Sequence, residues 1–320
     1  MGENLALTLL KLGSRGSPLA LTQSQNVKRL LESSGNNTVE ITVIKTVGDE
    51  RLNSLFHEIP GKGLFTRELD QALLRNQIDL AVHSLKDLPT ELSKGLRLSV
   101  TPERIDPRDV LVGRVGQDVL LRSLSPGSTI GTSSIRRAAM VLASRPDLKP
   151  TPIRGNIDSR IRRLDDGEYD ALILAGAGLI RLGIADRVSE WIEGDSWLNS
   201  PGQGALGIVI REKDHETDDF LKSIHCSSSH TVVAAERAFL SALGGGCEVP
   251  IAAGCVEHGL QLRLKGVVVS ADGLRMVKGD ITGASKNPVA LGKKLAEELL
   301  QKGADLLLEE LSQGIVFPGM

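Results

Sequence analysis

Two hydrophobic periods alternate along the first 190 residues of the chain. Short apolar runs predict strands, and they cover residues 6–13, 39–46, 78–85, 128–132 and 169–176. Amphipathic stretches predict helices between them, and these cover residues 17–33, 64–76, 133–145 and 156–167. Strands that alternate with helices of this length predict βαβ units and mainly parallel sheet, in which ligands bind beyond the C-terminal strand ends.

One pattern occurs twice. The stretches "LGSRGSPLAL" at residues 12–21 and "IGTSSIRRAA" at residues 130–139 each lead from a strand through glycine and a hydroxyl residue into a helix. This repetition predicts an α/β protein with two similar doubly wound lobes that face one another across a cleft. The polar, proline-containing residues 101–109 are typical of a crossover between the lobes, and the turn-rich residues 193–207 of a return.

The pattern changes after "HCSSSH" at residues 225–230. A helix is predicted at 231–243, a strand at 260–270 and one closing helix at 287–311, which together indicate a smaller α+β domain. We therefore expect three domains. They cover residues 7–103 with a return segment at 203–221, residues 109–198, and residues 227–320.

Composition excludes several classes of protein. Aromatic residues make up only 2% of the 320 residues and the formal net charge is −2, so neither base stacking nor a polyanionic partner such as nucleic acid is expected. No apolar run reaches the roughly 20 residues that a membrane helix needs. The N-terminal stretch lacks the features of a secretory signal. The three cysteines cannot all pair and none has CxxC spacing, which indicates free thiols.

Basic side chains gather between Gly131 and Arg163. They are Arg136, Arg137, Arg145, Lys149, Arg154, Arg160, Arg162 and Arg163, against Asp147 and Asp158. The adjacent pair Arg136 and Arg137 falls in the first turn of a predicted helix, where backbone N–H groups and the helix dipole favour a carboxylate or phosphate. For the outer members, a solvated helix face is the competing interpretation. The expected ligand is small and carries several carboxylates.

Two further stretches carry reactive groups. "LAVHSLKDLPT" places Lys86 and Asp87 at the end of an apolar strand, where Asp87 either stabilises a developing cation or caps the backbone. "SALGGGCEVP" presents Cys247 after three glycines, either as a turn with a small hydrophobic residue or as a thiol held out for chemistry. "GKGLF" and "GAGLIR" lack the nucleotide-binding patterns, and "HCSSSH" lacks a complete set of metal ligands, so neither a nucleotide nor a metal is expected.

Seven motifs taken together resemble the porphobilinogen deaminase family, also called hydroxymethylbilane synthase. They are "GSRGSPLAL", "GKGLF", "AVHSLKDLPT", "GTSSIRR", "RGN", "GQGALG" and "AAERAFLSALGGGCEVP", in order over nearly the whole chain. The resemblance implies lobes like those of periplasmic binding proteins and an enzyme of the tetrapyrrole pathway to haem and chlorophyll. Such an enzyme joins four porphobilinogen molecules head to tail, releases ammonia at each step and hydrolyses off hydroxymethylbilane.

The resemblance also implies roles for individual residues. Asp87 matches the catalytic aspartate, and Cys247 the residue that carries a dipyrromethane cofactor through a thioether. Further cofactor-binding residues are Lys86, Ser134, Arg136, Arg137, Arg154 and Asn156. The implied substrate-binding residues are Arg15, Ser17, Lys62, Thr132, Arg160, Arg181 and Gln203. Glu58 stands where some members of the family have a second lysine.

Two rival functions are a two-lobed anion-binding protein without catalysis and a hydrolase that uses Cys247 as nucleophile. The first gives no reason for a third domain with a glycine-flanked thiol, and the second needs a histidine in a recognisable motif. The resemblance implies a monomer that hands its product to the next enzyme of the pathway. The expected location is the chloroplast stroma, because the sequence looks most like plastid forms, with the cytoplasm as the alternative.

Overall fold

The computed structural model describes residues 8–35, 37–46, 66–195, 197–245 and 249–312. The chain divides into two compact units. The first consists of Met1–Arg104 and Ala205–His230, and the second of Ile105–Gly204 and Thr231–Met320. The chain therefore passes from one unit to the other more than once. The division into three domains stays a prediction.

The first unit is built on a five-stranded sheet in the order β2-β1-β3-β10-β4. Its strands are β1 (Thr8–Ser14), β2 (Asn37–Val43), β3 (Leu80–Ser84), β4 (Leu96–Val100) and β10 (Leu206–Arg211). β1 runs parallel to β2 and β3, whereas β10 runs antiparallel to β3 and β4. Four of the five strands therefore run in one direction, as the expectation of mainly parallel sheet requires, and β10, which comes from the return segment, is the antiparallel member.

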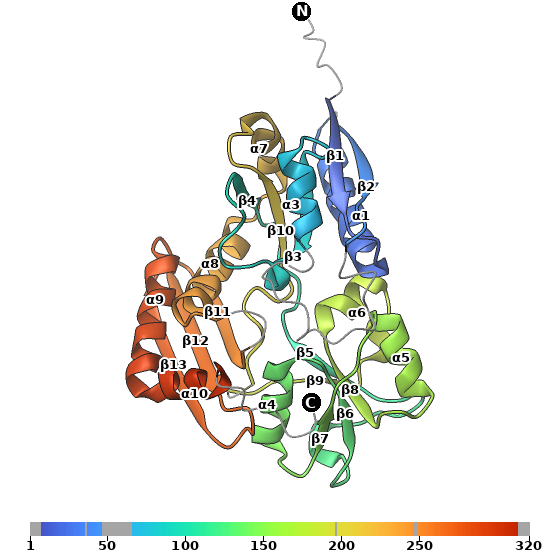
Figure 1. The fold of residues 1–320 in the computed structure, drawn as a ribbon, viewed down its shortest axis with the longest axis vertical. Coiled ribbons are helices and arrows are strands. Elements are labelled where there is room, and N and C mark those ends of the chain that lie inside the picture. The colour runs from blue at the N-terminus through green and yellow to red at the C-terminus, as the bar shows by residue number, and fades with distance from the viewer. Residues whose placement is uncertain (1–7, 36, 47–65, 196, 246–248, 313–320) are drawn as a thin grey trace, which may run out of the picture. The chain divides into compact units, whose positions relative to one another are not determined.

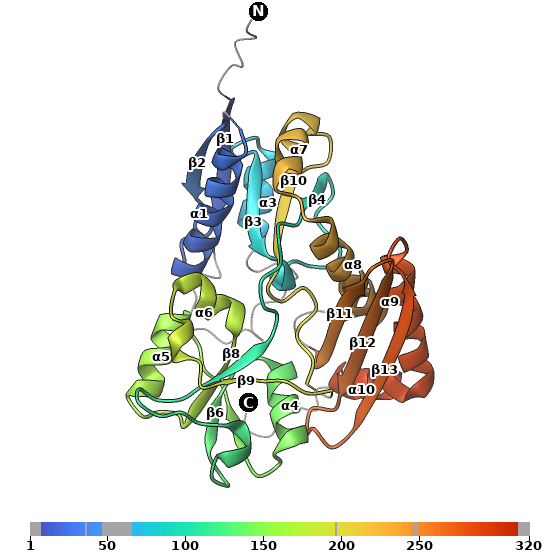
Figure 2. The same cartoon turned by 180° about the vertical axis from the view of Figure 1, so that it is seen from behind.

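Helices cover both faces of this sheet. They are α1 (Pro18–Ser33), α3 (Arg67–Leu74) and α7 (His215–Leu221), with short 3₁₀ turns η2 (Leu85–Asp87) and η5 (Lys222–Ile224). Figures 1 and 2 show α1 and α3 on opposite faces. Leu12, Val27 and Leu31 pack in the core between α1 and the strands, which buries the apolar face of the helix.

The second unit contains a sheet of the same layout, in the order β7-β6-β8-β5-β9. Its strands are β5 (Asp109–Val112), β6 (Thr129–Gly131), β7 (Lys149–Thr151), β8 (Ala171–Ala175) and β9 (Glu190–Trp191). β6 runs parallel to β7 and β8, and β5 runs antiparallel to β8 and β9. The two sheets thus share one pattern of strand directions, which confirms the two similar lobes predicted from the sequence.

Alternate residues of these strands face two different cores. Leu111 and Ile173 pack with α4 (Ile135–Ser144), whereas Val110 and Leu172 pack on the other side with residues of α5 (Ile157–Asp165) and α6 (Gly176–Leu182). Short 3₁₀ turns are η3 (Leu121–Ser123) and η4 (Ala185–Arg187). A strand buried on both faces reads as a continuous apolar run, which is the pattern of the sequence at β5 and β8.

The remaining part of the second unit is an antiparallel sheet with helices. Its elements are β11 (Ile251–His258), β12 (Gln261–Val269), β13 (Met276–Ala284), α8 (Ser227–Ala242), α9 (Pro288–Leu299) and α10 (Asp305–Ser312). α4 lies between this sheet and the sheet of β5 to β9 (Figures 1 and 2). Val267 of β12 belongs to the same hydrophobic core as the buried residues of α4. The single closing helix predicted at 287–311 is wrong: the wider turn Leu300–Ala304 interrupts it, where Gly303 has φ of 96°.

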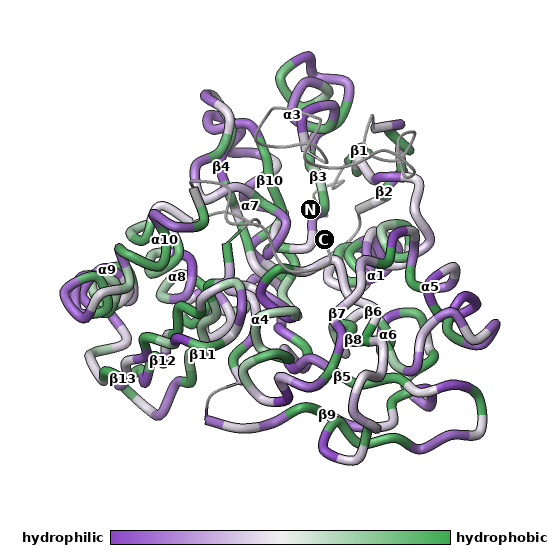
Figure 3. Tube along the Cα trace, turned by 60° about the horizontal axis from the view of Figure 1, so that its bottom comes forward, coloured by the Kyte–Doolittle hydropathy of each residue, from purple (hydrophilic) through white to green (hydrophobic). Residues whose placement is uncertain are grey.

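The hydropathy of the chain follows this architecture. In Figure 3, β3 and β10 are coloured mostly as hydrophobic, whereas α9 carries both colours along its turns. All residues of β10 except its last are buried, while α9 buries one face that includes Leu291, Leu295 and Leu299. Within the described ranges, no helix combines the length and the apolar character that crossing a membrane requires.

Candidate functional site

The predicted residues of the first unit follow two neighbouring parallel strands. Arg15 and Ser17 come directly after β1, and Lys86 and Asp87 directly after β3. The C-terminal ends of parallel neighbours meet at one edge of a sheet. Ser17 is the N-cap of α1 and its hydroxyl accepts a hydrogen bond from the backbone N–H of Ala20 at 3.3 Å, which starts the helix at Pro18.

Asp87 ends the short turn η2 and its side chain is exposed. Within the described part of the chain its carboxylate accepts no hydrogen bond and forms no ion pair. The alternative interpretation of Asp87 as a local backbone cap is therefore not what the structure has. An exposed carboxylate without a protein partner is available to a ligand.

His83 lies on β3, shortly before Lys86 and Asp87 in the sequence, and is 6% exposed. Burial, together with the charge of Arg15, lowers its pKa to about 4. Its Nε2 atom is buried and has no hydrogen-bond partner among the described residues. The imidazole is therefore neutral at pH 7, and His83 adds no positive charge to that of Arg15.

In the second unit, Thr132 and Ser134 follow β6 in the way that Arg15 and Ser17 follow β1. The Thr132 hydroxyl accepts a hydrogen bond from the backbone N–H of Ser134 at 3.2 Å. Ser134 is the N-cap of α4 and its hydroxyl accepts from the backbone N–H of Arg137 at 3.4 Å. Both hydroxyls thus shape the strand-to-helix turn.

Arg136 and Arg137 are 4% and 7% exposed, and both reach the carboxylate of Asp109, which is fully buried. The Arg136 Nη1 atom donates to Asp109 Oδ2 at 2.7 Å, and Arg137 Nε donates to Oδ1 at 2.9 Å. Burial alone would raise the pKa of the Asp109 carboxyl, but the charges of the two arginines outweigh it and hold that pKa far below its usual value. Asp109 is therefore ionised, and the group of three keeps one net positive charge.

Arg160 lies on α5, close to Arg137 and Arg154. Burial, and then the positive charges of these two arginines, lower the pKa of Arg160 to about 10. Its Nε atom donates to the backbone oxygen of Gly155 at 2.8 Å, and no ion pair neutralises it within the described chain. Asn156, the N-cap of α5, makes no side-chain capping hydrogen bond. Uncompensated, half-buried positive charge of this kind favours an anionic ligand.

Arg181 contacts the return segment, and Gln203 is part of it. Burial lowers the pKa of Arg181 to about 10, and its Nη2 atom donates to the backbone oxygen of Gly204 at 2.8 Å. Gln203 is 1% exposed; its Nε2 atom donates to Asp109 Oδ1 at 2.9 Å and its Oε1 atom accepts from Arg137 Nη2 at 3.2 Å. The side-chain amide of Gln203 thus belongs to the Asp109 network.

Two predicted site residues, Lys62 and Cys247, lie outside the described residues. Asp109 was missed in the sequence, where it reads as the last residue of a polar linker, "TPERIDPRD". The signal that could have marked it is its place as the first residue of an apolar strand, because an acidic residue at the start of a fully buried run needs a buried positive partner.

The outer basic residues fit the alternative of a solvated or locally paired surface. Arg145 pairs with Asp147, with Nε to Oδ1 at 2.8 Å, and Arg163 pairs with Glu168 at 2.7 Å. Arg162 and Lys149 are exposed. Surface ion pairs of this kind contribute little to stability, so these side chains are not part of the candidate site.

Among the described residues, the other thiols and histidines form no recognisable site. Cys226 is half-buried and Cys255 buried, and both are free thiols. The rings of His225 and His230 lie 5.2 Å apart edge to face. Over the described ranges, no three residues of the metal-binding types gather closely enough to hold a metal ion.

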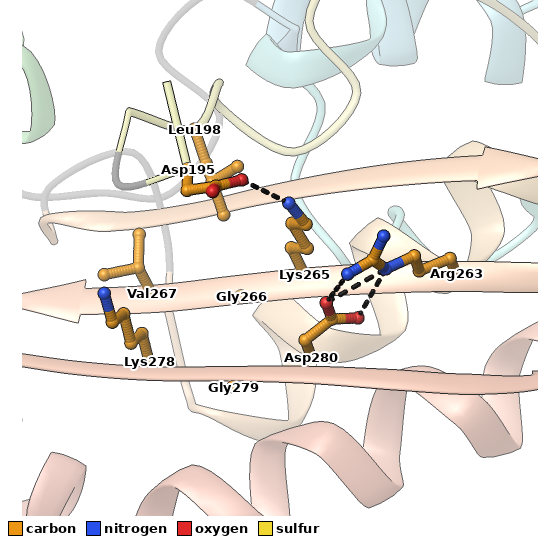
Figure 4. Close-up of a pocket in the computed structure, with 9 residues that line it drawn as sticks. All are labelled: Asp195, Leu198, Arg263, Lys265, Gly266, Val267, Lys278, Gly279 and Asp280. Atoms are coloured by element: carbon orange, nitrogen blue, oxygen red, sulfur yellow. Dashed lines mark hydrogen bonds and ion pairs between the residues drawn. The ribbon is translucent and has the colours of Figure 1, made fainter. Parts of the chain in front are cut away.

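A separate pocket of about 260 Å³ lies on the exposed face of β12 and β13 (Figure 4). Lys265 Nζ contacts Asp195 Oδ1 at 2.7 Å, and Arg263 Nε donates to Asp280 Oδ2 at 2.9 Å, as the dashed lines in Figure 4 show. None of its lining residues belongs to the predicted site. Because four of its five charged residues already pair with one another in an open position, we assign it no function.

Two family models match most of the chain. Residues 10–219 match the family model described as porphobilinogen deaminase, dipyromethane cofactor binding domain. Residues 230–301 match the model described as porphobilinogen deaminase, C-terminal domain.

Curated relatives agree over nearly the full length. A porphobilinogen deaminase of Geobacter metallireducens is 46% identical over 305 residues, which cover 95% of each chain. One of Pelobacter propionicus is 43% identical and covers 95% of this chain and 97% of its own. One of Carboxydothermus hydrogenoformans is 44% identical and covers 93% of this chain and 96% of its own. These relatives are bacterial and give no support to the chloroplast location expected from the sequence.

The chain also has similarities to solved structures, all at low sequence identity. The methionine-binding protein MetQ covers 72% of this chain and 94% of its own with a TM-score of 0.44 and 11% identity. The VFT2 domain of Bordetella pertussis BvgS covers 72% of this chain and 92% of its own with a TM-score of 0.41 and 16% identity. Both similarities are weak, so the assignment to a family rests on the sequence matches.

Proposed function

Because the chain belongs to the porphobilinogen deaminase family, we propose that it joins four porphobilinogen molecules head to tail with release of ammonia and hydrolyses off hydroxymethylbilane. The observation that carries this function is the match of both family models, at residues 10–219 and 230–301. A non-catalytic anion-binding protein is not favoured, since it gives no reason for the second match.

The positive residues of the second unit support binding of a ligand with several carboxylates. Porphobilinogen carries an acetate and a propionate, so each added ring brings two negative charges. Arg160 and Arg181 are half-buried and have pKa values lowered to about 10, which means that burial already penalises their charge. A carboxylate beside them relieves that penalty and gains charge-assisted hydrogen bonds.

The cofactor we propose is a dipyrromethane held through a thioether to Cys247. When bound, it supplies the pyrrole carbon to which the first substrate ring is joined. Its carboxylates suit the arginines that follow β6 and β7. Asp109 holds Arg136 and Arg137, and the positive charges of Arg137 and Arg154 act on the nearby Arg160. Ser134, Asn156 and Lys86 are the further side chains proposed to hold it. Thr132, Arg15, Ser17, Lys62 and Gln203 complete the proposed substrate contacts.

Asp87 is the catalytic residue we propose. Loss of ammonia from porphobilinogen leaves a cation on the pyrrole ring, and the carboxylate oxygens of Asp87 would stabilise this cation and hold the pyrrole N–H protons. The exposed, unpartnered state of its side chain in the described chain supports this role.

The partner we propose is therefore the substrate porphobilinogen, bound by a monomer that passes its product to the next enzyme of the pathway. The bacterial relatives support the cytoplasmic alternative for its location.

The intact mass of the purified protein tests the function and the cofactor together. We expect a covalent addition with the mass of two pyrrole units, lost in Cys247→Ser, because a hydroxyl is a far weaker nucleophile than a thiolate. Cys226→Ser is the matched control and should keep both the addition and the activity, as should Cys255→Ser. An active wild-type protein without the addition, or an active Cys247→Ser variant, would contradict the proposal.

A further inference from the structure

We infer that Asp109 is a positioning residue for the two arginines of the candidate site, an inference that rests on the proposed function. Asp109 is the first residue of β5 and is fully buried. Arg136 and Arg137 come from the first turn of α4. Neighbouring residues on a helix point about 100° apart, yet both guanidinium groups converge on this one carboxylate.

Five donated hydrogen bonds hold the carboxylate. Oδ1 accepts from Arg136 Nη2 at 3.2 Å, Arg137 Nε at 2.9 Å and Gln203 Nε2 at 2.9 Å. Oδ2 accepts from Arg136 Nη1 at 2.7 Å and Trp197 Nε1 at 3.1 Å. Donors from α4 and from the turn-rich stretch that contains Trp197 and Gln203 therefore meet at a single group at the start of β5, which leaves the arginine side chains little freedom to rotate.

The charge balance explains why a carboxylate is needed there. Two guanidinium groups buried side by side repel each other, and a low-polarity surrounding strengthens that repulsion. One ionised aspartate cancels one of the two charges and leaves the other for an anion. Asparagine has the same shape but no charge, and its amide N–H would face donors.

Asp109 and the ligand need not touch for this role. Arg137 Nη1 also donates to the backbone oxygen of Ile173 at 3.2 Å, and Arg136 Nη1 donates to that of Leu198 at 2.9 Å. The guanidinium groups are thus fixed on several sides before a ligand arrives, and binding a carboxylate costs little rearrangement. Removing Asp109 would loosen the arginines and leave them repelling one another.

The test compares Asp109→Asn and Asp109→Glu with a matched control, Asp170→Asn. Asp170 accepts from the Thr129 backbone N–H at 2.8 Å in the same sheet and pairs with Arg114, away from the candidate site. For each folded protein, we measure the fraction that carries the covalent addition, and KM and kcat for porphobilinogen.

In Asp109→Asn we expect a lower loaded fraction and a KM raised by about ten- to a hundredfold, with kcat of the loaded protein changed much less. Asp109→Glu should recover part of both quantities, because it keeps the charge. Asp170→Asn should stay loaded with an unchanged KM even if its melting temperature falls. A folded Asp109→Asn protein that is fully loaded with the parent's KM would overturn the inference.

A second variant tests the positioning role if Asp109→Asn does not fold. Trp197→Phe keeps the packing but removes one donor to Oδ2, so we expect a rise in KM of about threefold; an unchanged KM there would refute the positioning role. If wild-type protein carries no addition and does not turn over porphobilinogen, the proposed function fails instead, whatever the variants do.

Discussion

Two aspartates show how surroundings decide what one residue type does. Asp109 is buried, accepts five hydrogen bonds and holds two arginines, whereas Asp87 is exposed and its carboxylate has no partner in the described chain. The first is committed to the protein and the second is available to a ligand. His83, buried on the strand before Asp87, is a third case, because burial keeps its imidazole neutral.

The charge and the position of Asp87 can be tested separately. Asp87→Asn keeps the shape but loses the charge, so turnover should fall by about two to four orders of magnitude while substrate still binds. Asp87→Glu keeps the charge one methylene away and should retain some turnover. The measurement is the rate of hydroxymethylbilane formation by variants loaded with preassembled cofactor. Equal rates for the two variants would mean that Asp87 has only a structural role.

Strand, turn and helix form the same local unit in both sheets. After β1, Ser17 caps α1; after β6, Ser134 caps α4. Each serine starts its helix by accepting a backbone hydrogen bond, and each turn carries an arginine in or beside it. In the C-terminal part, by contrast, elements are held by close packing: Gly292 of α9 lies against Ala235 and Phe239 of α8.

Because α9 lies close to α8 at Gly292, adding one methyl group there should destabilise the protein. In Gly292→Ala the new Cβ would lie 2.3 Å from the Ala235 backbone oxygen and 2.7 Å from the Phe239 backbone nitrogen. We expect the free energy of unfolding to fall by about 1–3 kcal/mol, although alanine is the better helix former. Urea denaturation measures it. Lys294→Ala, exposed on the same helix, should stay within about 0.5 kcal/mol of the parent; a Gly292→Ala protein as stable as this control would refute the packing argument.

At the scale of the whole molecule, the chain makes two sheets with the same order of strand directions, and the first sheet takes one strand, β10, from a distant part of the sequence. β10 completes the first sheet after the chain has built the second, and Asp109 opens the second sheet directly after the crossover. The predicted site residues are shared out accordingly: Arg15, Ser17, Lys86 and Asp87 belong to the first unit, and the arginines after β6 to the second.

The stability of the protein should depend on pH through His83. Unfolded histidine takes up a proton below about pH 6.5, whereas burial lowers the pKa of His83 in the folded protein to about 4. The unfolded state therefore binds more protons between these values, and stability is lost as the pH falls from 6.5 to 4, by about 3 kcal/mol in total. Denaturant unfolding at several pH values should show this loss reduced in His83→Gln. His258→Gln, at an exposed position, is the control; the same pH dependence in His83→Gln and wild type would rule out the effect.

The sequence by itself determined the alternation of β1, β2, β3, β6 and β8 with helices α1, α3, α4 and α5, the two similar lobes and the family, because these depend on local periodicity and on short motifs whose residues are neighbours in the chain. Tertiary structure decided what local pattern does not encode. The direction of β10 depends on how a return segment enters a sheet, and the break at Gly303 interrupts a continuous helical pattern. The partner of Arg136 lies 27 positions away, and Gln203 lies 94 positions from the same aspartate. A buried charge is stable only beside its partner, and it is the packing of β5 against α4 and the return segment that brings Asp109, Arg136, Arg137 and Gln203 together.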